Sequence, residues 1–308
     1  MIRRCLLAML LLGVLGGCQG PPATGVAPSP SVEPSGPGSD ADETVETVPA
    51  TAKDVTYKGT QRLDLYAGKG SGPRPLIVWV HGGGWQSGDK SQCLPVRLGF
   101  PDRGYSVACV NYRLSAVAPF PAQIEDVRDA IAFLRTNAGR FGLDARRFVA
   151  WGSSAGGHLV ALAGTTSGST AFTPDAAGSA VQAVVDYFGP IDLVALATTP
   201  GYTSHANADS AESNLLGGPV LEQTEAARRA NPVSYVDRGD PPCLIVHGSA
   251  DPVVPPPQSQ LFHDALQAAG VPVELRVIPG AKHGGPEFSA PETVDLVLTF
   301  LSTHLGPP

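Results

Sequence analysis

The sequence is poor in cysteine, positive charge and long apolar runs. Its 308 residues include five cysteines, and 21 Lys and Arg side chains stand against 28 Asp and Glu. The formal charge of -7, with no basic stripe among aromatic residues, argues against a nucleic-acid partner. No Cys and His spacing indicates a zinc site. With 43% apolar residues the chain can bury a large core, and one catalytic domain is the simplest interpretation.

The first 18 residues have the pattern of an export signal. Arg3 and Arg4 precede the uncharged run 5–15, which is too short to span a membrane, and small residues follow it. Residues 15–18 (LGGC) resemble the lipobox of bacterial lipoproteins, in which the cysteine is acylated and becomes the new N-terminus. We expect a signal peptide over residues 1–18 and lipidation of Cys18. The alternative is an ordinary signal peptide that is cut nearby.

Residues 19–52 are rich in Pro, Gly, Ser, Thr and Ala and have almost no large apolar side chains. They cannot bury enough surface to offset their ordering entropy, so we expect a disordered tether. The tether would hold a soluble catalytic domain, residues 53–308, away from a membrane that it meets only through the lipid anchor.

Three cysteines fall in the expected domain: Cys93, Cys109 and Cys243. Three allow at most one disulfide and leave one free thiol. Cys109 and Cys243 lie in apolar strand-like runs, which is typical of small buried thiols. The sequence leaves open whether any two of the three are paired.

From about residue 53 the chain alternates apolar runs with stretches of helical period. Strands are expected at 63–66, 76–80, 106–110, around 148, and at 181–187, 242–247 and 273–278, and helices at 122–137 and 259–269. This alternation predicts an α/β fold with a mostly parallel central sheet and helices on both faces. The stretch 193–240 fits the alternation least, and we interpret it as an insertion over the strand ends that helps to form the substrate pocket.

The most informative motif is Gly-Ser-Ser-Ala-Gly at residues 152–156. It follows the apolar run 147–151 and precedes a helix-compatible stretch, so it predicts a strand, a sharp turn and a helix. Such a turn needs glycine on both sides because added Cβ atoms would collide with the strand and the helix. It would expose Ser154 at the end of the sheet as a nucleophile.

A serine needs a general base, and the base needs an acid that orients it. Asp251 follows the expected strand 242–247 and His283 follows 273–278, and the order Ser154, Asp251, His283 is that of the α/β-hydrolase triad. Cofactors are not required.

Several rival residues have simpler roles. We interpret His247 as a structural loop histidine and His158 as a packing or capping residue, and we regard Asp237 and Asp240 as solvated loop charges. Asp186 and Asp192 are the reserve candidates for the acid.

Residues 81–85 (HGGGW) follow the expected strand 76–80, and their glycines allow main-chain N–H groups to turn inward. We predict an oxyanion hole formed by the N–H groups of Gly83, Gly84 and Ala155. His81 would fix the loop by hydrogen bonding, and Trp85 would bind substrate as a wall of the acyl pocket.

The motifs together resemble α/β-hydrolase esterases near the hormone-sensitive-lipase group, and above all the bifunctional feruloyl and acetyl xylan esterase branch. The resemblance covers about residues 54–304 and rests on these segments: 81–85, 111–114, 120–127, 151–158, 187–190, 214–218, 251–254 and 280–283. It implies an α/β-hydrolase fold and the same three residues, Ser154, Asp251 and His283. The sequence departs from the wider group at Ser153, where aspartate is common, and in lacking a helical N-terminal cap, which favours an open cleft.

These observations predict a secreted or cell-envelope serine carboxylesterase. Its expected substrates are short-chain acyl esters, with acetyl or feruloyl groups on plant polysaccharide as the favoured class. The alternatives are a peptidase of the prolyl-oligopeptidase type and a non-catalytic binding protein on a hydrolase scaffold. The first would lack its propeller-sized extension, and the second would retain a complete triad without using it.

Overall fold

The computed structural model describes residues 51–308. The predicted signal peptide, Cys18 and nearly all of the predicted tether lie outside the described residues. Within the described residues, none of the helices is long and apolar enough to cross a membrane.

An eight-stranded sheet forms the centre of the unit, with the strand order β1-β2-β4-β3-β5-β6-β7-β8. β1 and β2 pair antiparallel, as do β2 and β4, and every later pair is parallel. The strands are β1 (Ala52–Lys58), β2 (Gln61–Tyr66), β3 (Arg74–Val80), β4 (Ser106–Val110), β5 (Leu143–Ser153), β6 (Ala183–Tyr187), β7 (Cys243–Gly248) and β8 (Val273–Ile278). The predicted fold class, a mostly parallel sheet with helices on both faces, is confirmed.

Helices alternate with the parallel strands. The α-helices are α1 (Leu94–Arg97), α2 (Ala122–Thr136), α3 (Ala138–Phe141), α4 (Ala155–Thr165), α5 (Leu193–Thr198), α6 (Ala211–Leu216), α7 (Thr224–Ala230), α8 (Pro257–Ala269) and α9 (Pro291–Leu305). Short 3-10 turns are η1 (Pro101–Arg103), η2 (Thr203–Ala206), η3 (Pro232–Tyr235) and η4 (Pro286–Phe288). The sequence prediction missed β1 and α9 and located the other long elements to within a few residues.

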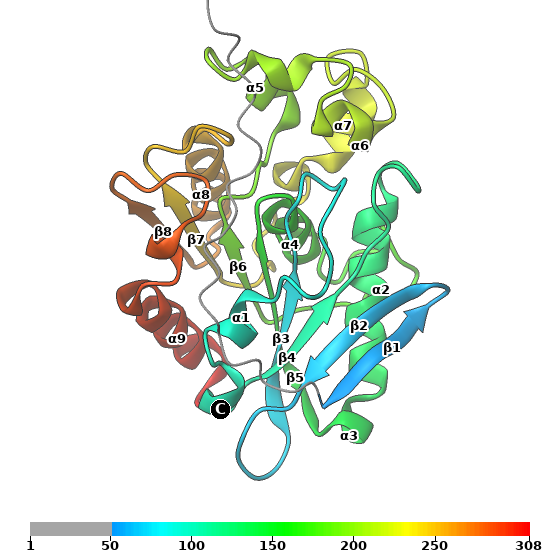
Figure 1. Ribbon diagram of the computed structural model, residues 1–308, viewed down its shortest axis with the longest axis vertical. Coiled ribbons are helices and arrows are strands. Elements are labelled where there is room, and N and C mark those ends of the chain that lie inside the picture. Colours follow the sequence, from blue (N-terminus) through cyan, green and yellow to red (C-terminus); the bar gives the residue numbers. More distant parts are fainter. Residues whose placement is uncertain (1–50) are drawn as a thin grey trace, which may run out of the picture. The chain divides into compact units, whose positions relative to one another are not determined.

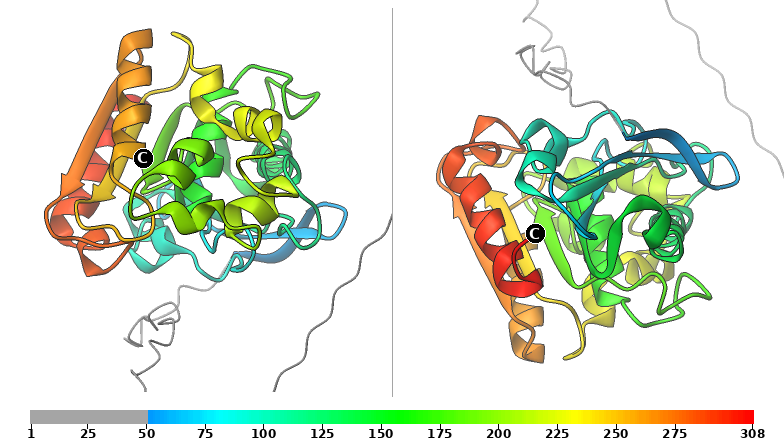
Figure 2. Two further views of the ribbon diagram at one scale, coloured as in Figure 1. Left: turned by 90° about the horizontal axis from the view of Figure 1, so that it is seen from above. Right: turned by 90° about the horizontal axis from the view of Figure 1, so that it is seen from below.

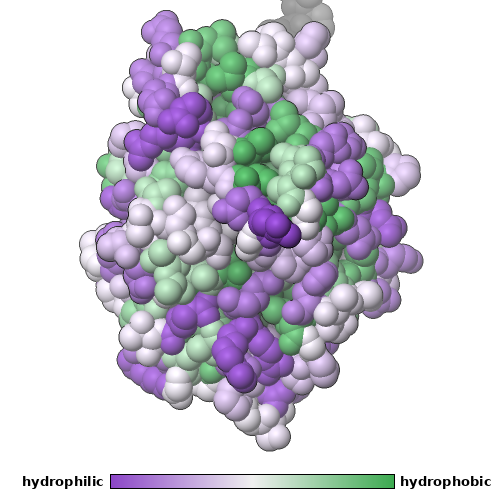
Figure 3. All heavy atoms as spheres, turned by 180° about the vertical axis from the view of Figure 1, so that it is seen from behind, coloured by the Kyte–Doolittle hydropathy of each residue, from purple (hydrophilic) through white to green (hydrophobic). Residues whose placement is uncertain are grey.

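The sheet has a hydrophobic core on each face, because its central strands are buried on both sides. Leu76 and Val78 of β3 point into the core that α2, α4 and α8 cover, whereas Ile77 and Trp79 point into the core that α1 and α9 cover. Figure 1 shows the layers, and both views of Figure 2 show β1 and β2 at one edge and β8 at the other. Hydrophobic side chains on the back face lie in separate groups among hydrophilic ones (Figure 3).

The segment 193–240 forms the predicted insertion. It contains α5, η2, α6, α7 and η3, and it lies beyond the carboxyl ends of the parallel strands (Figure 1). Asp192 caps α5 by accepting hydrogen bonds from the N–H groups of Val194 and Ala195. Asp240, at the end of the insertion, is 8% exposed, and its carboxylate accepts a hydrogen bond from Asp237 N–H. The prediction that Asp240 is a solvated charge is therefore wrong.

A disulfide joins Cys93, just before α1, to Cys109 of β4. The sequence left the pairing of the three cysteines open; Cys109 is paired because β4 brings its sulfur to the loop that follows β3. Cys243 of β7 is a buried free thiol, as expected.

Candidate active site

Ser154 lies between β5 and α4 in a strained turn. Its φ of 54° and ψ of -121° are unusual for a residue other than glycine, and such strain is typical of functional sites. A Cβ on Gly152 would lie 2.3 Å from the carbonyl oxygen of Gly156, and one on Gly156 would lie 2.0 Å from that of Val80. Both glycines are therefore required, because larger residues would collide with the main chain.

Ser154, His283 and Asp251 form a continuous hydrogen-bonded chain. His283 Nε2 lies 2.8 Å from Ser154 Oγ, and His283 Nδ1 lies 2.7 Å from Asp251 Oδ2. Ser154 follows β5, Asp251 follows β7 and His283 follows β8, so the parallel strands deliver all three residues to one end of the sheet. Since Asp251 accepts at Nδ1, that nitrogen carries the proton, and Nε2 is free to accept the proton of Ser154.

The Asp251 carboxylate is held ionised. Burial alone would raise the pKa of this carboxyl, but hydrogen bonds from His247 and His283 hold the pKa well below its ordinary value. Its other oxygen, Oδ1, accepts hydrogen bonds from the N–H groups of Val253 and Val254, at 2.8 and 2.9 Å. The carboxylate can therefore stabilise a charged imidazole.

His247 is the site residue that the sequence prediction missed. Its Nε2 lies 3.2 Å from Asp251 Oδ2, so two imidazoles share one carboxylate oxygen. His247 belongs to β7 and lies four residues before Asp251. This short spacing from Asp251, which was already the predicted acid, is the sequence signal that could have identified His247 as a site residue.

The loops after β7 and β8 are joined to each other. Ser249 N–H donates to Ile278 O, Ala250 N–H donates to Ala281 O, and Gly280 N–H donates to Ser249 Oγ, at 3.0, 2.9 and 2.8 Å. The insertion adds a further hydrogen bond, from the Tyr202 hydroxyl to the main-chain oxygen of Asp251. The acid and the base are thus fixed relative to each other.

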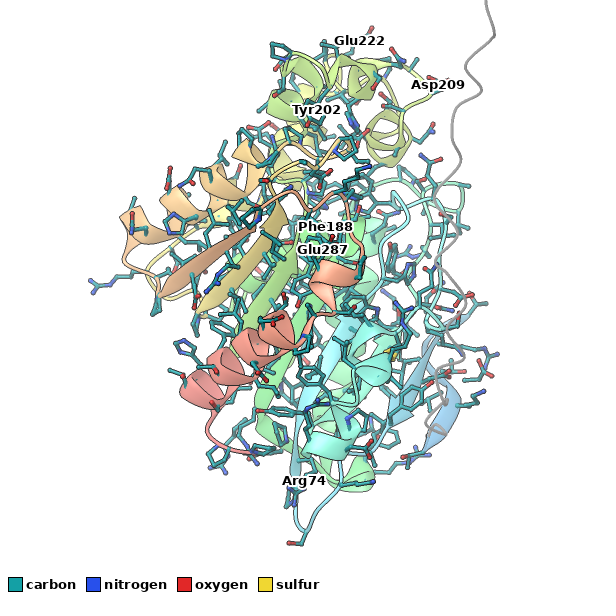
Figure 4. The ribbon with its side chains drawn as sticks, turned by 60° about the vertical axis from the view of Figure 1, so that its left-hand side comes forward. Arg74, Phe188, Tyr202, Asp209, Glu222 and Glu287 are labelled. Atoms are coloured by element: carbon teal, nitrogen blue, oxygen red, sulfur yellow. A yellow bond between two sulfur atoms is a disulfide. The ribbon has the colours of Figure 1, made fainter. Side chains whose placement is uncertain are left out.

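Phe188 packs against the imidazole of His283. The two ring centres are 4.7 Å apart, and the ring of Phe288 lies 4.6 Å from Phe188 on another side. The backbone of Phe188 has a positive φ of 46°, and its N–H donates to Val246 O. In Figure 4, Phe188 lies below the insertion, which carries Tyr202. This packing restricts the orientation of the His283 imidazole.

The glycine loop after β3 lies against the elbow. A Cβ on Gly82 would be 2.9 Å from Ser153 O and 3.3 Å from Ser154 Cβ. Gly83 and Gly84 have φ values of 101° and 58°. Within residues 51–308, the N–H groups of Gly83, Gly84 and Ala155 donate no hydrogen bond to the protein. Three main-chain donors close to Ser154 therefore remain available for a ligand.

His81 and Tyr112 support this loop from inside. Their rings stack with centres 4.4 Å apart, and His81 Nδ1 donates to Gly82 O at 2.7 Å. Burial lowers the pKa of His81, so the ring is neutral and acts as a donor in the loop.

Trp85 does not form the predicted wall of a substrate pocket. Its indole is 1% exposed and meets the ring of His158 edge to face, with centres 5.3 Å apart. The prediction of substrate binding by this side chain is wrong, because the positive φ of Trp85, 57°, turns it into the core under α4. His158 is a packing residue, as expected: its Nε2 donates to Ala230 O at 2.6 Å.

The two reserve candidates for the acid lie elsewhere. Asp186, at the end of β6, is fully buried, and its Oδ1 accepts a hydrogen bond from Gly189 N–H. Burial raises the pKa of the Asp186 carboxyl to about 6. Asp192 caps α5. Neither carboxylate contacts His283, whereas Asp251 does.

The fold and the hydrogen-bonded Ser, His and Asp at its strand ends define an α/β-hydrolase. Comparison with known families assigns it further: residues 63–266 match the BD-FAE family, and the chain belongs to that family. The resemblance predicted from the motifs is confirmed.

Curated relatives carry esterase names. Esterase LipQ of Mycobacterium tuberculosis is 33% identical over 80% of this chain, and esterase LipC of the same organism is 33% identical over 73%. These matches cover 58% of LipQ and 57% of LipC, so the chain spans little more than half of each relative.

Solved structures agree in fold. A truncated carbohydrate esterase from gut microbiota has a TM-score of 0.73 at 28% identity, covering 84% of this chain and 98% of that one. A butyrate-bound esterase from Thermogutta terrifontis has a TM-score of 0.68 at 28% identity, covering 85% and 98%.

Proposed function

We propose that the protein is a serine carboxylesterase that uses Ser154, His283 and Asp251. The observation that supports this proposal most strongly is the hydrogen-bonded chain from Ser154 Oγ through both nitrogens of His283 to Asp251. His283 takes the Ser154 proton as Oγ attacks the ester carbonyl, and Asp251 stabilises the imidazolium. His283 then gives the proton to the leaving alcohol, and water, activated by the same imidazole, hydrolyses the acyl-enzyme.

The N–H groups of Gly83, Gly84 and Ala155 supply the oxyanion hole in this proposal. They lie on the loop and the elbow that meet at Ser154, and they have no other acceptor in the described part of the chain. Removal of one such donor typically costs about 3 kcal/mol of transition-state stabilisation. The glycines suit this role because their positive φ values direct the main chain in a way that other residues adopt only with strain.

The proposed substrates are short acyl esters on carbohydrate. The support comes from the structural neighbours, which include the carbohydrate esterase named above and an acetyl ester-xyloside bifunctional hydrolase from Caldicellulosiruptor lactoaceticus at 26% identity. The butyrate bound to the Thermogutta terrifontis enzyme supports a short acyl chain. Acetyl and feruloyl groups on plant polysaccharide are the favoured donors.

A hydrolysis panel tests the activity and the substrate class. The panel holds p-nitrophenyl acetate, butyrate and longer esters, methyl ferulate, acetylated xylan and a prolyl peptide. We expect fast turnover of the short esters, release of acetate from xylan, and a loss of at least about 10⁴-fold in kcat for Ser154→Ala. Ser153→Ala, the neighbouring serine, is the matched control and should keep its activity. Preference for long-chain esters or for the prolyl peptide would contradict the substrate proposal.

We further propose that the protein is exported and anchored through Cys18. The basic and apolar start of the sequence supports export, and so does the Cys93–Cys109 disulfide, because disulfides persist mainly in oxidising compartments. In a bacterial host, the full chain should enter the membrane fraction with an acylated Cys18, and Cys18→Ala should lack the acyl group by mass spectrometry. Unmodified full chain in the cytoplasm would contradict this proposal.

A further inference from the structure

A second imidazole, that of His247, lies beside the Asp251 carboxylate. His247 Nε2 lies 2.9 Å from Val254 O and 3.2 Å from Asp251 Oδ2, and His247 Nδ1 lies 2.6 Å from the hydroxyl of Ser259 on α8. The sequence of groups is therefore Ser, His, Asp, His, Ser, with Asp251 at the centre. His247 and Ser259 are both fully buried, so the second serine cannot meet a substrate.

The partners determine the proton positions on His247. Its Nε2 faces two oxygens that can only accept, a carbonyl and a carboxylate, so Nε2 carries a hydrogen. The Ser259 hydroxyl has no acceptor other than Nδ1 in the described part of the chain, so it donates to Nδ1. The neutral ring with hydrogen on Nε2 satisfies all of these groups at once.

We infer that the buried His247–Ser259 pair positions the Asp251 carboxylate for catalysis, with both side chains acting as positioning residues that never touch substrate. Ser259 fixes the tautomer of His247, so that Nε2–H donates to Val254 O at 2.9 Å and lies 3.2 Å from Asp251 Oδ2. Val253 and Val254 N–H groups hold Oδ1. With both oxygens held, the carboxylate keeps the orientation in which its remaining acceptor direction meets Nδ1 of His283.

Because His247 is neutral, it leaves the negative charge of the Asp251 carboxylate in place. A neutral N–H donor fixes the carboxylate without cancelling its charge, so Asp251 remains a full counter-ion for the imidazolium that forms at His283. Among the described residues, the one other side-chain donor to Asp251 is His283 itself. No lysine or arginine pairs with Asp251 within residues 51–308, so orientation depends on this pair and on main-chain N–H groups.

Variants of both residues test the inference, which rests on the proposed esterase activity. His247→Leu removes the donor, and His247→Gln restores an amide that can donate at the Nε2 position and accept from Ser259. Ser259→Ala is the milder change. Ser106→Ala is the matched control, because Ser106 is also buried and its hydroxyl accepts one hydrogen bond, from Gly68 N–H. Ser106 is the first residue of β4, whereas the site lies beyond the carboxyl ends of β5, β7 and β8.

We expect His247→Leu to lower kcat for p-nitrophenyl acetate by at least about tenfold, towards the roughly 100-fold loss that a 1 Å misplacement can cause, with KM little changed. His247→Gln should recover most of this loss, and Ser259→Ala should show a smaller loss than His247→Leu. Ser106→Ala should keep kcat. A loss of melting temperature alone, equal in Ser259→Ala and Ser106→Ala and without a change in kcat, would overturn the inference.

Proton NMR provides a readout that does not need turnover. The Nδ1–H of His283, bonded to Asp251, should give a downfield resonance that is absent in His283→Ala, and it should move or broaden in Ser259→Ala but not in Ser106→Ala. An unchanged resonance in folded Ser259→Ala and His247→Gln, with unchanged kcat, would refute positioning. If the wild type shows no Ser154-dependent turnover, the proposed function fails, and the resonance still decides whether the pair orients Asp251.

Discussion

Removal of the Cys93–Cys109 disulfide should destabilise the fold by about 3 kcal/mol. The two cysteines are 16 residues apart, and a loop of this size corresponds to about 3 kcal/mol of chain entropy removed from the unfolded state at 25 °C. For a domain of this length, each kcal/mol shifts the melting temperature by roughly 2–4 °C, so we expect a decrease of about 6–12 °C. Gly83 and Gly84 lie near the start of the segment between β3 and α1, whereas Cys93 lies at its end, and Ala155 belongs to α4. Loss of the disulfide should therefore change kcat at 25 °C little.

The double variant Cys93→Ala with Cys109→Ala makes this change, and calorimetry or urea unfolding measures it. Cys243→Ala is the control, because it removes a buried sulfur of the same kind that is not cross-linked. The control isolates the loss of sulfur packing from the loss of the cross-link. If the double variant loses no more stability than two such packing changes account for, the loop-closure reasoning is refuted.

Three further predictions concern the elbow and buried ionisable groups. Gly156→Ala should abolish soluble folding or activity, because its Cβ would lie 2.0 Å from a β3 carbonyl oxygen, whereas Gly139→Ala, with nothing within 4 Å, should be neutral or stabilising by melting temperature. Burial raises the pKa of the Asp186 carboxyl to about 6, so the stability that Asp186 contributes should fall by up to about 3 kcal/mol as pH rises from about 4 to 6. The difference in unfolding free energy between wild type and Asp186→Asn, measured in urea, should change by this amount over that range, and parallel curves would contradict the prediction. The hydrogen bond with Glu212 raises the pKa of His205 above its ordinary value. The stability that His205 contributes should therefore be present below about pH 6.5 and lost as pH rises. The difference in melting temperature between wild type and His205→Gln should be larger at low pH, and an equal difference at all pH values would count against the prediction.

Much of the fold follows from local sequence pattern. The predicted strands 106–110 and 273–278 match β4 and β8 at both ends, because turn residues bound both segments. Ser154, Asp251 and His283 could be selected because each follows a predicted strand, and parallel strands end at the same edge of a sheet. The structure brings the three side chains together at hydrogen-bonding distance.

The remaining features depend on neighbours that are distant in sequence. The burial of Trp85 follows from a positive φ and from the position of α4, neither of which a glycine-rich motif reveals. Pairing of Cys93 with Cys109 requires β4 to lie beside β3 in the sheet, an order that the alternation of elements does not specify. The role of His247 depends on Ser259 in the following helix, and a buried strand histidine has many simpler interpretations.

The hydrogen bonds between the loops after β7 and β8 make the acid and the base one mechanical unit, separate from the strand that bears the nucleophile. Displacement of this unit as a whole would change the distance from His283 to Ser154 while leaving the bond between His283 and Asp251 intact. Substitutions in β8, the edge strand, should therefore affect the reaction by changing one distance, that between the His283 imidazole and the Ser154 hydroxyl. Substitutions in β8 can therefore tune the activity without altering the hydrogen bond between His283 and Asp251.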